Sequence, residues 1–432
     1  MSDDRLLALH AGREVGAVQK GRGNRLTFRY REEWRSSPGA FPLSLSMPLA
    51  AADHGHEVIT AFLWGLLPDN ELILERWGRR FGVSARNAFA LLAQVGEDCA
   101  GAIQFVRPER VDAVLASGAA DIDWLDEKAV ADRLRALRVD PAAWRIARDV
   151  GHFSLGGAQP KTALHHMNGR WGVPSGRTPT THILKPPTVG LDGHVENEHV
   201  CLALARALRI PAASSEVMSF HDEVAIVVER YDRQATQRTR AVVRVHQEDL
   251  CQALGLMPTS KYQNDGGPSP ERVVDLLRTH SSNPREDVGT FVDALAFNWL
   301  IAGTDGHGKN YSVLHGPGGR LRLAPLYDLA SVLPYDDFEP QRVRLAMKIG
   351  GKYRIRDIGR RQWERLAGDL RLDPEETVDR VVELARLVPE RSSEVLQIAR
   401  SKGLTHPILE KLGRALMARS EQCLSTLVKR AG

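Results

Sequence analysis

A run of polar residues in the second half of the chain has the composition and spacing of a phosphoryl-transfer loop. Asp305 and Asn310 stand five residues apart with His307 and Lys309 between them, and Asp328 follows shortly after. Phosphoryl transfer uses one carboxylate to orient the attacking hydroxyl, and an Asn and a second Asp to hold Mg²⁺ on the phosphates. Protein kinases place their catalytic Asp and metal-binding Asn at this spacing. The same residue types are common in plain turns, so the interpretation depends on the surrounding elements.

Hydrophobic periodicity predicts the elements that would hold this loop. Residues 287–302 repeat apolar side chains at helical spacing, as in a buried helix, and Gly303 is expected to end it. Residues 311–314 and 321–323 are expected to form two strands around a Gly-rich turn. The loop would therefore lie between a buried helix and a hairpin, with Asp328 just beyond the hairpin.

A second candidate stretch, residues 153–164, carries Gly156-Gly157 between strand-like flanks. Glycines allow backbone N–H groups to approach a phosphate closely. The stretch is not a Walker A loop, because Pro160 stands where that motif requires a Gly before the Lys. A hairpin turn without any ligand is the competing interpretation.

Residues 182–185 form a predicted strand that ends in Lys185, and a strand lysine after a Gly-rich loop is the kinase order for gripping phosphates. Glu196 or Glu198, which open the next predicted helix, could pair with this lysine. Alternatively, the two glutamates only favour the helix N-terminus through its dipole. The apolar strand 224–231 ends where a hinge between two lobes, and contact with adenine, would fall.

Three further features have competing interpretations. His307 could join Asp305 in a metal site, but no second His or Cys has ligand spacing, so we expect it to orient the loop. The turn-rich stretch 260–268 is expected near the active site. A set of arginines could form a basic face, although charge runs are usually just solvated: Arg230, Arg233, Arg238, Arg240 and Arg244.

Composition sets broad bounds on the protein. With 432 residues, 43% hydrophobic and 26% charged, the chain is of the soluble globular class and long enough for two or three domains. No apolar run reaches the ~18 residues of a membrane span. The four cysteines form no CxxC pair, which favours reduced thiols and a cytoplasmic location. The net charge of +4 permits contact with nucleic acid without requiring it.

The order of predicted elements favours an α+β protein with a bilobal, protein-kinase-like fold. We expect a small N-terminal mixed α/β domain over residues 1–108, a kinase N-lobe with the Gly-rich loop over 109–245, and a helical C-lobe over 246–432. Within these segments we expect a strand over residues 43–47 and a linker over 108–121. We expect an early helical turn over 247–251 and a helix over 375–387. A further helix is expected over 85–94, with Ser84 capping it.

Several of these motifs, taken together and in order, resemble the HipA family, bacterial serine/threonine kinases that serve as toxins of toxin–antitoxin pairs. The likeness runs from about Leu6 to the C-terminal helices. The motifs that carry it are Ser154–Lys161, Thr178–Lys185, Glu229–Arg233, Gln247–Gln252, Lys261–Pro268 and Thr304–Asn310.

The resemblance implies a role for each matching residue. Asp305 would be the catalytic aspartate, with His307 and Asn310 beside it, and Asn310 and Asp328 would hold Mg²⁺. Ser154 matches the serine that the family phosphorylates on itself. The residues that would bind ATP are Leu155, Gly156, Gly157, Ala158, Gln159, Lys161, Lys185, Glu229, Arg230 and Tyr231.

The resemblance also implies ATP and Mg²⁺ as cofactors, and a HipB-like helix-turn-helix antitoxin that carries the toxin onto operator DNA. The known type of substrate is an aminoacyl-tRNA synthetase, whose phosphorylation inhibits translation and promotes growth arrest and persistence. A co-repressor with weak kinase activity is the alternative, and a small-molecule kinase is a third reading. Pro160, where some members have Glu, lacks an N–H donor and fixes φ, which could shift the loop between its phosphate-covering and displaced forms.

Overall fold

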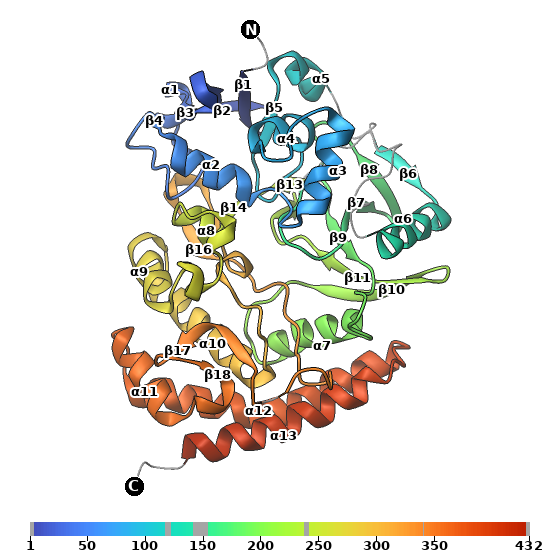
Figure 1. The fold of residues 1–432 in the computed structure, drawn as a ribbon, viewed down its shortest axis with the longest axis vertical. Coiled ribbons are helices and arrows are strands. Elements are labelled where there is room, and N and C mark those ends of the chain that lie inside the picture. Colours follow the sequence, from blue (N-terminus) through green and yellow to red (C-terminus); the bar gives the residue numbers. More distant parts are fainter. Residues whose placement is uncertain (1–3, 117–121, 141–153, 237–241, 340, 429–432) are drawn as a thin grey trace. The chain divides into compact units, whose positions relative to one another are not determined.

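The structure, a computed structural model, describes residues 4–116, 122–140, 154–236, 242–339 and 341–428 (Figure 1). The chain divides into two compact units. The first comprises Met1–Pro186, Met218–Ser260 and Ser312–Leu321, and the second comprises Pro187–Val217, Lys261–Tyr311 and Arg322–Gly432. The boundaries of the three segments expected from the sequence stay a prediction.

An antiparallel sheet begins the first unit, with the strand order β4-β3-β2-β1-β5. Its strands are β1 (Arg5–His10), β2 (Arg13–Lys20), β3 (Leu26–Tyr30), β4 (Asp53–His54) and β5 (Gln104–Val106). The helices of this part are α1 (Glu32–Arg35), α2 (His56–Gly65), α3 (Glu71–Phe81) and α4 (Ala88–Val95). Strand β3 alternates buried and exposed residues, so its apolar side chains enter a core that α2 and α4 complete.

A second set of antiparallel strands in the first unit carries the residues expected to bind nucleotide. They are ordered β11-β9-β7-β8-β6. Their bounds are β6 (Ile122–Leu125), β7 (Thr162–Met167), β8 (Arg170–Pro174), β9 (His182–Lys185) and β11 (Glu223–Glu229), with β10 (Ser215–Phe220) leading into β11. The remaining elements here are α5 (Val111–Ala116), α6 (Glu127–Val139), β12 (Arg233–Ala235), β13 (Val242–Arg244), β14 (His246–Asp249), α8 (Leu250–Ala253) and β15 (Ser312–His315).

The second unit is mainly helical. Its helices are α7 (His194–Ala207), α9 (Pro270–His280), α10 (Pro284–Ile301), α11 (Arg360–Asp369), α12 (Pro374–Ser401) and α13 (Ile408–Val428). Strand β16 (Leu321–Leu323) lies at the unit boundary, and β17 (Arg344–Ile349) pairs with β18 (Lys352–Arg354) in an antiparallel ribbon. Helix α10 packs against α9, α12 and α13. The helix that leads into the candidate catalytic loop is therefore held inside a helical core.

Several local predictions were wrong, each for a physical reason. Residues 43–47 form no strand, because the Tyr30 hydroxyl takes the place of a neighbouring strand: it donates to the Met47 carbonyl at 2.6 Å and accepts from Leu43 N–H at 2.7 Å. The helix over 85–94 starts later, at Ala88, because the Asn87 side chain caps it in place of Ser84.

The other differences come from tertiary contacts. Residues 246–249 are a strand paired with β15, and α8 starts only after Asp249, whose side chain caps it. The expected linker contains α5, and residues 117–121 lie outside the described residues. Helix α12 continues past Leu387 through Pro389 to Ser401, because its later turns still bury Val395 and Leu396. Among the described residues, no helix combines the length and the apolar character that a membrane crossing requires.

Candidate active site

The candidate catalytic loop is built at the end of α10. The helix stops where Ala302 adopts a left-handed conformation (φ 52°). The Gly303 N–H donates to the Asn298 carbonyl at 2.8 Å, and the Asn298 side chain donates to the Tyr311 hydroxyl at 3.0 Å. A Cβ at Gly303 or Gly306 would come within 2.4 Å and 2.9 Å of the Asn298 amide. Glycine at both positions therefore lets the loop close around Asn298, a positioning residue that the sequence reasoning missed.

Asp305 turns its carboxylate toward solvent, with 60% of its side chain exposed. The Tyr262 hydroxyl donates to its Oδ1 at 2.7 Å, and His307 Nε2 lies 3.8 Å from the same oxygen. The rings of Tyr262 and His307 meet edge to face at 4.9 Å. Burial lowers the pKa of His307, and the Asp305 charge only partly opposes that effect, so the imidazole is neutral at neutral pH. Two rings thus position a solvent-facing carboxylate.

Asn310 and Asp328 lie side by side. The Asn310 Nδ2 donates to Asp328 Oδ2 at 3.3 Å. The Tyr327 hydroxyl donates to the Lys309 carbonyl at 2.7 Å and so fastens the Asp328 segment to the loop. Asp328 has φ 59°, a left-handed conformation that Asp and Asn tolerate better than most residues. An amide and a carboxylate oxygen are thereby available together, which is a donor set that suits Mg²⁺.

The Gly-rich stretch lies in the first unit and is attached to the turn before α3. The Ser154 hydroxyl is fully buried and donates to the Leu66 carbonyl at 2.8 Å, while the Ser154 N–H donates to the Asp98 carbonyl at 3.0 Å. The Gly157 carbonyl accepts from the Asp69 N–H at 3.1 Å. Gly157 has φ 97°, which a residue with a side chain rarely adopts. The loop is therefore closed onto its own unit.

The other residues expected to meet ATP lie on neighbouring strands of the same unit. Lys185 ends β9 as a buried residue, and it pairs in register with Ile226 of β11. Glu229 ends β11, and the Tyr231 hydroxyl donates to the Gln247 side chain. Lys161 donates to the Gly156 carbonyl at 2.6 Å. Glu196 and Glu198 belong to α7 of the second unit, so their pairing with Lys185 stays a prediction.

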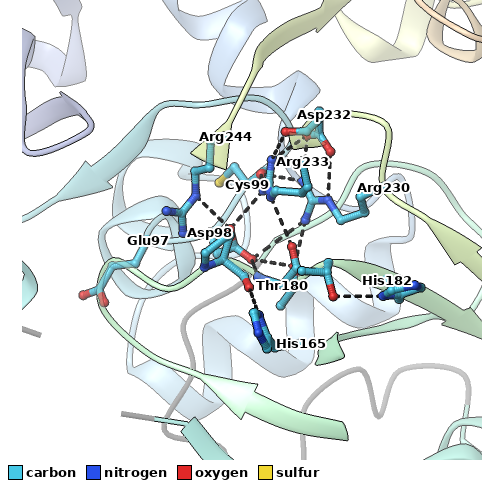
Figure 2. A network of polar contacts seen from close by, with 12 residues as sticks. Glu97, Asp98, Cys99, His165, Thr180, His182, Arg230, Asp232, Arg233 and Arg244 are labelled. Atoms are coloured by element: carbon cyan, nitrogen blue, oxygen red, sulfur yellow. Dashed lines mark hydrogen bonds and ion pairs between the residues drawn. The ribbon is translucent and has the colours of Figure 1, made fainter. Parts of the chain in front are cut away.

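Arg230, one of the residues expected to bind ATP, uses its side chain elsewhere. Its guanidinium is buried and donates to both carboxylate oxygens of Asp232 and to the Thr180 hydroxyl (Figure 2). Arg233 bridges Asp232 and Asp98 at 2.8 Å and 3.0 Å. The Arg230 backbone is also hydrogen-bonded, since its N–H donates to the Thr181 carbonyl at 2.9 Å and its carbonyl accepts from the Arg233 N–H at 3.1 Å. Contact of Arg230 with a nucleotide stays a prediction.

Asp98 is the meeting point of this network. It accepts hydrogen bonds from Arg233, Arg244 and both donors of Thr180. Burial alone would raise the pKa of Asp98, but the three neighbouring guanidinium groups outweigh it and hold that pKa well below its usual range. Burial also raises the pKa of the adjacent Cys99 thiol to about 12. Asp98 therefore stays charged, and Cys99 stays protonated.

The network corrects the idea of a basic face. Arg230 and Arg233 are buried, and Arg244 gives most of its guanidinium to Asp98. Arg238 and Arg240 lie outside the described residues. Two carboxylates neutralise the buried arginines, and although Asp232 is adjacent in sequence, Asp98 lies more than a hundred positions earlier, so the sequence does not indicate the network.

The structure thus assembles the expected residues within each unit. In the second unit it brings together Asp305, His307, Asn310 and Asp328, and it adds Tyr262, Asn298 and Tyr327, which the sequence reasoning did not single out. Stretch 260–268 lies beside the candidate catalytic loop, because the Tyr262 hydroxyl donates to Asp305.

Known proteins with similar sequences define the family. Residues 6–106 match a model described as the HipA N-terminal domain, and residues 153–391 match the HipA-like C-terminal domain. A protein of Sinorhizobium fredii named "Putative kinase Y4mE" is 37% identical over 359 residues, covering 82% of this chain and 83% of its own. The serine/threonine-protein kinase toxin HipA of Shewanella oneidensis is 32% identical over 380 residues, covering 85% and 83%.

A solved structure is similar along the whole chain. It contains HipA, HipB and operator DNA of the Shewanella oneidensis toxin–antitoxin system, and its matched chain has a TM-score of 0.81 and 28% identity, with 97% of each chain covered. The α+β, kinase-like fold class expected from the sequence is confirmed by this match. The relatives are named as kinases. The chain belongs to the HipA family.

Proposed function

We propose that this chain is an ATP-dependent serine/threonine protein kinase that acts as the toxin of a toxin–antitoxin pair. The observation that carries the proposal is the arrangement at the end of α10, where a solvent-facing Asp305 shares one loop with Asn310, and Asn310 contacts Asp328 at 3.3 Å. An orienting carboxylate next to an amide–carboxylate pair is what phosphoryl transfer requires. Three segments, residues 1–108, 109–245 and 246–432, would be the domains.

The residues present fit Mg²⁺ and ATP. Mg²⁺ is usually bound through one or two carboxylates together with phosphates and waters, and Asn310 and Asp328 provide one carboxylate and one amide oxygen. Bound MgATP supplies the phosphoryl group that is transferred. The Lys185 ammonium would hold its phosphates, the stretch Leu155–Lys161 would cover them, and the backbone of Glu229 and Tyr231 would meet adenine.

Asp305 would act on the acceptor side of the reaction. Its exposed carboxylate accepts a hydrogen bond from the acceptor hydroxyl and takes the proton as the oxygen attacks phosphorus. The contacts from Tyr262 and His307 keep that carboxylate in one orientation. A neutral His307 suits this role, because it adds no positive charge that would weaken Asp305 as a proton acceptor.

We further propose a HipB-like helix-turn-helix antitoxin and operator DNA as partners. The likeness over 97% of the chain to a protein solved with HipB and operator DNA supports this assignment. An aminoacyl-tRNA synthetase is the proposed substrate, on the strength of the family resemblance. Its phosphorylation would inhibit translation in the cytoplasm and lead to growth arrest and persistence.

Ser154 is the proposed site of self-inactivation. A phosphate there adds about −1.5 to −2 charges, which a buried position against the Leu66 carbonyl cannot accept. The modified loop would leave its place and no longer cover ATP. Purified active protein should carry phosphate on Ser154, the Asp305→Asn form should not, and the phosphorylated form should bind ATP more weakly in calorimetry.

Labelled ATP and Mg²⁺ test the main proposal. The purified chain, incubated with a cell extract, should label a small set of proteins. Phosphoproteomics should then find serine or threonine sites that are phosphorylated in cells expressing the intact chain and not in cells expressing Asp305→Asn. Label on no protein, the chain itself included, would overturn the kinase and favour the alternative, a co-repressor that binds the antitoxin on operator DNA. Label only on a metabolite would favour a small-molecule kinase.

A further inference from the structure

A pocket lies directly beside the candidate catalytic aspartate in the second unit. It encloses about 280 Å³ and is lined by Thr304, the residue before Asp305, by Tyr262, and by residues of the β17–β18 ribbon that include Arg344 and Tyr353. This volume is slightly below the ~300 Å³ at which most small-molecule sites begin. It suits the side chains of a polypeptide segment that reaches the loop.

Hydrogen bonds and close packing hold the segments that line the pocket together. The Lys348 N–H donates to the Gln263 side chain at 2.7 Å, which fastens β17 to the segment that carries Tyr262. The Lys261 carbonyl accepts from the Gly308 N–H at 3.0 Å, which fastens the same segment to the catalytic loop. At the ribbon turn, a Cβ on Gly350 would lie 2.1 Å from the Gln362 carbonyl, so the turn sits directly on α11. The ribbon and the loop are thereby held together.

The ribbon is strongly basic. Between residues 344 and 354 it carries Arg344, Lys348, Lys352 and Arg354 and no acidic residue. The Arg344 guanidinium lies 5.5 Å from the centre of the Tyr353 ring, and the Lys348 ammonium lies 5.2 Å from the same ring (β17 and β18 in Figure 1). In the described part of the chain, neither of these two cations has a carboxylate within ion-pair distance.

One acidic residue approaches the ribbon from the neighbouring segment. The pKa of Tyr353 is raised, mainly by burial and to a smaller extent by the nearby negative charge of Asp265. The Asp265 carboxylate already accepts a hydrogen bond from the Asn264 side chain at 2.7 Å. The Asn264 amide leaves the charge of Asp265 in place, but in the described residues Asp265 is not within ion-pair distance of Arg344. Arg344 therefore offers the pocket a planar guanidinium suited to two parallel bonds with a carboxylate.

Tyr262 shows how close the acceptor would come. Its hydroxyl donates to Asp305 Oδ1 at 2.7 Å, in the manner that an acceptor serine or threonine would donate to the same carboxylate. It also lines the pocket. Tyr262 therefore places the pocket next to the carboxylate that an acceptor hydroxyl would approach.

We propose that this pocket reads the protein substrate, by accepting an acidic side chain adjacent to the phosphorylated serine or threonine. The inference rests on the proposed function, and it names the class of segment that the kinase selects. Arg344 binds the carboxylate, and Tyr353 supports the Arg344 guanidinium through its ring face.

Synthetic peptides with one serine flanked by Glu, Ala or Lys test the subsite. The intact chain should phosphorylate the Glu peptide with a kcat/KM about 10- to 100-fold above that of the Lys peptide, the effect of one hydrogen bond to a charged group, expressed mainly in KM. Arg344→Glu should abolish or reverse this preference. Lys352→Glu is the matched control, because it makes the same charge change at an exposed position of the ribbon that does not line the pocket, and it should keep the preference.

The outcomes separate the two proposals. Equal use of the three peptides by the intact chain, or an unchanged preference in Arg344→Glu, overturns the subsite and leaves the kinase in place. Loss of the preference in both variants alike also overturns it, since general charge attraction would then explain the result. No transfer to any peptide together with no Mg²⁺-dependent ATP hydrolysis overturns the proposed function and the subsite with it.

Discussion

The buried network around Asp98 and the loop around Asp305 are both built from aspartates and their hydrogen-bond donors, yet they differ in how completely those donors surround the carboxylate. Asp98 accepts hydrogen bonds from Thr180, Arg233 and Arg244, and it is only 7% exposed. Among the described residues, the Asp305 carboxylate accepts a hydrogen bond from Tyr262 alone, and 60% of its side chain is exposed. A saturated carboxylate holds the fold together, whereas an undersaturated one is available for a substrate.

The comparison predicts where removing a charge costs activity and where it costs stability. Asp305→Asn should lower phosphoryl transfer by about 10²- to 10⁴-fold, because an amide cannot take the acceptor proton. Its melting temperature should stay close to that of the wild-type chain, since the carboxylate is mostly exposed and an amide still accepts from Tyr262. Initial rates with labelled ATP, together with a thermal melt, measure both. Unaltered turnover would contradict the role of Asp305.

Arg233→Met should have the opposite profile. It keeps much of the side-chain volume but leaves Asp98 and Asp232 with fewer donors in a buried site, which typically costs about 3–5 kcal/mol of unfolding free energy. Urea unfolding measures that change. Arg29→Met serves as the control, because it removes one guanidinium from an exposed pair with Asp53 in the same unit. A change no larger in Arg233→Met than in this control would mean that the network does not stabilise the fold.

Asp328 tests whether a carboxylate of the candidate site affects ligand binding rather than stability. Asp328→Asn should weaken Mg²⁺-dependent ATP binding by roughly 10- to 100-fold, the range typical for changes around a metal's ligands. Asn is preferable to Ala here because it tolerates the left-handed φ of 59° and can still accept from Asn310. Calorimetry with and without Mg²⁺ gives the affinity. Equal MgATP affinity in the two proteins would remove Asp328 from the metal site.

The smallest expected effect is a pH dependence from Asp98. Its pKa is lowered in the folded chain, so its contribution to stability is full above the unfolded pKa near 4 and is lost as the pH falls toward the folded pKa. The stability gap between wild type and Asp98→Asn should therefore narrow below pH ~4, by about 1.4 kcal/mol per pH unit. Unfolding free energies measured from pH 5 downward show this slope. A gap that stays constant with pH would contradict the depressed pKa.

Sequence reasoning succeeded where the determinants are local. The spacing of Asp305 and Asn310 and the position of Asp328 survive because one helix end and one short connection set them. Strand β9 was predicted with its observed bounds because its apolar residues and the following prolines are adjacent in the chain. The spacing within the loop and the bounds of β9 depend on residues a few positions apart, and Asp328 follows Asn310 by 18 positions.

It failed where a partner comes from far along the chain. Asp98 accepts a hydrogen bond from Arg233 across 135 positions of the sequence. Residues 247–249 look helical until β15 supplies a neighbouring strand. Asp232 stands between Arg230 and Arg233 and pairs with both, but the second carboxylate of the network, Asp98, lies 135 positions from Arg233, so the sequence gives no sign that the group is buried.

The contact of Ser154 with Leu66 would limit the rate at which the Ser154 hydroxyl can be modified. A hydroxyl that is fully enclosed can be modified only while the loop is briefly open, so the rate of modification equals the open fraction multiplied by the rate for an exposed serine. Each 1.4 kcal/mol in the free energy of opening lengthens that delay about tenfold. If Ser154 is the site proposed above, the stability of the turn at residues 66–69, far in sequence from Asp305, would set how fast that serine is modified.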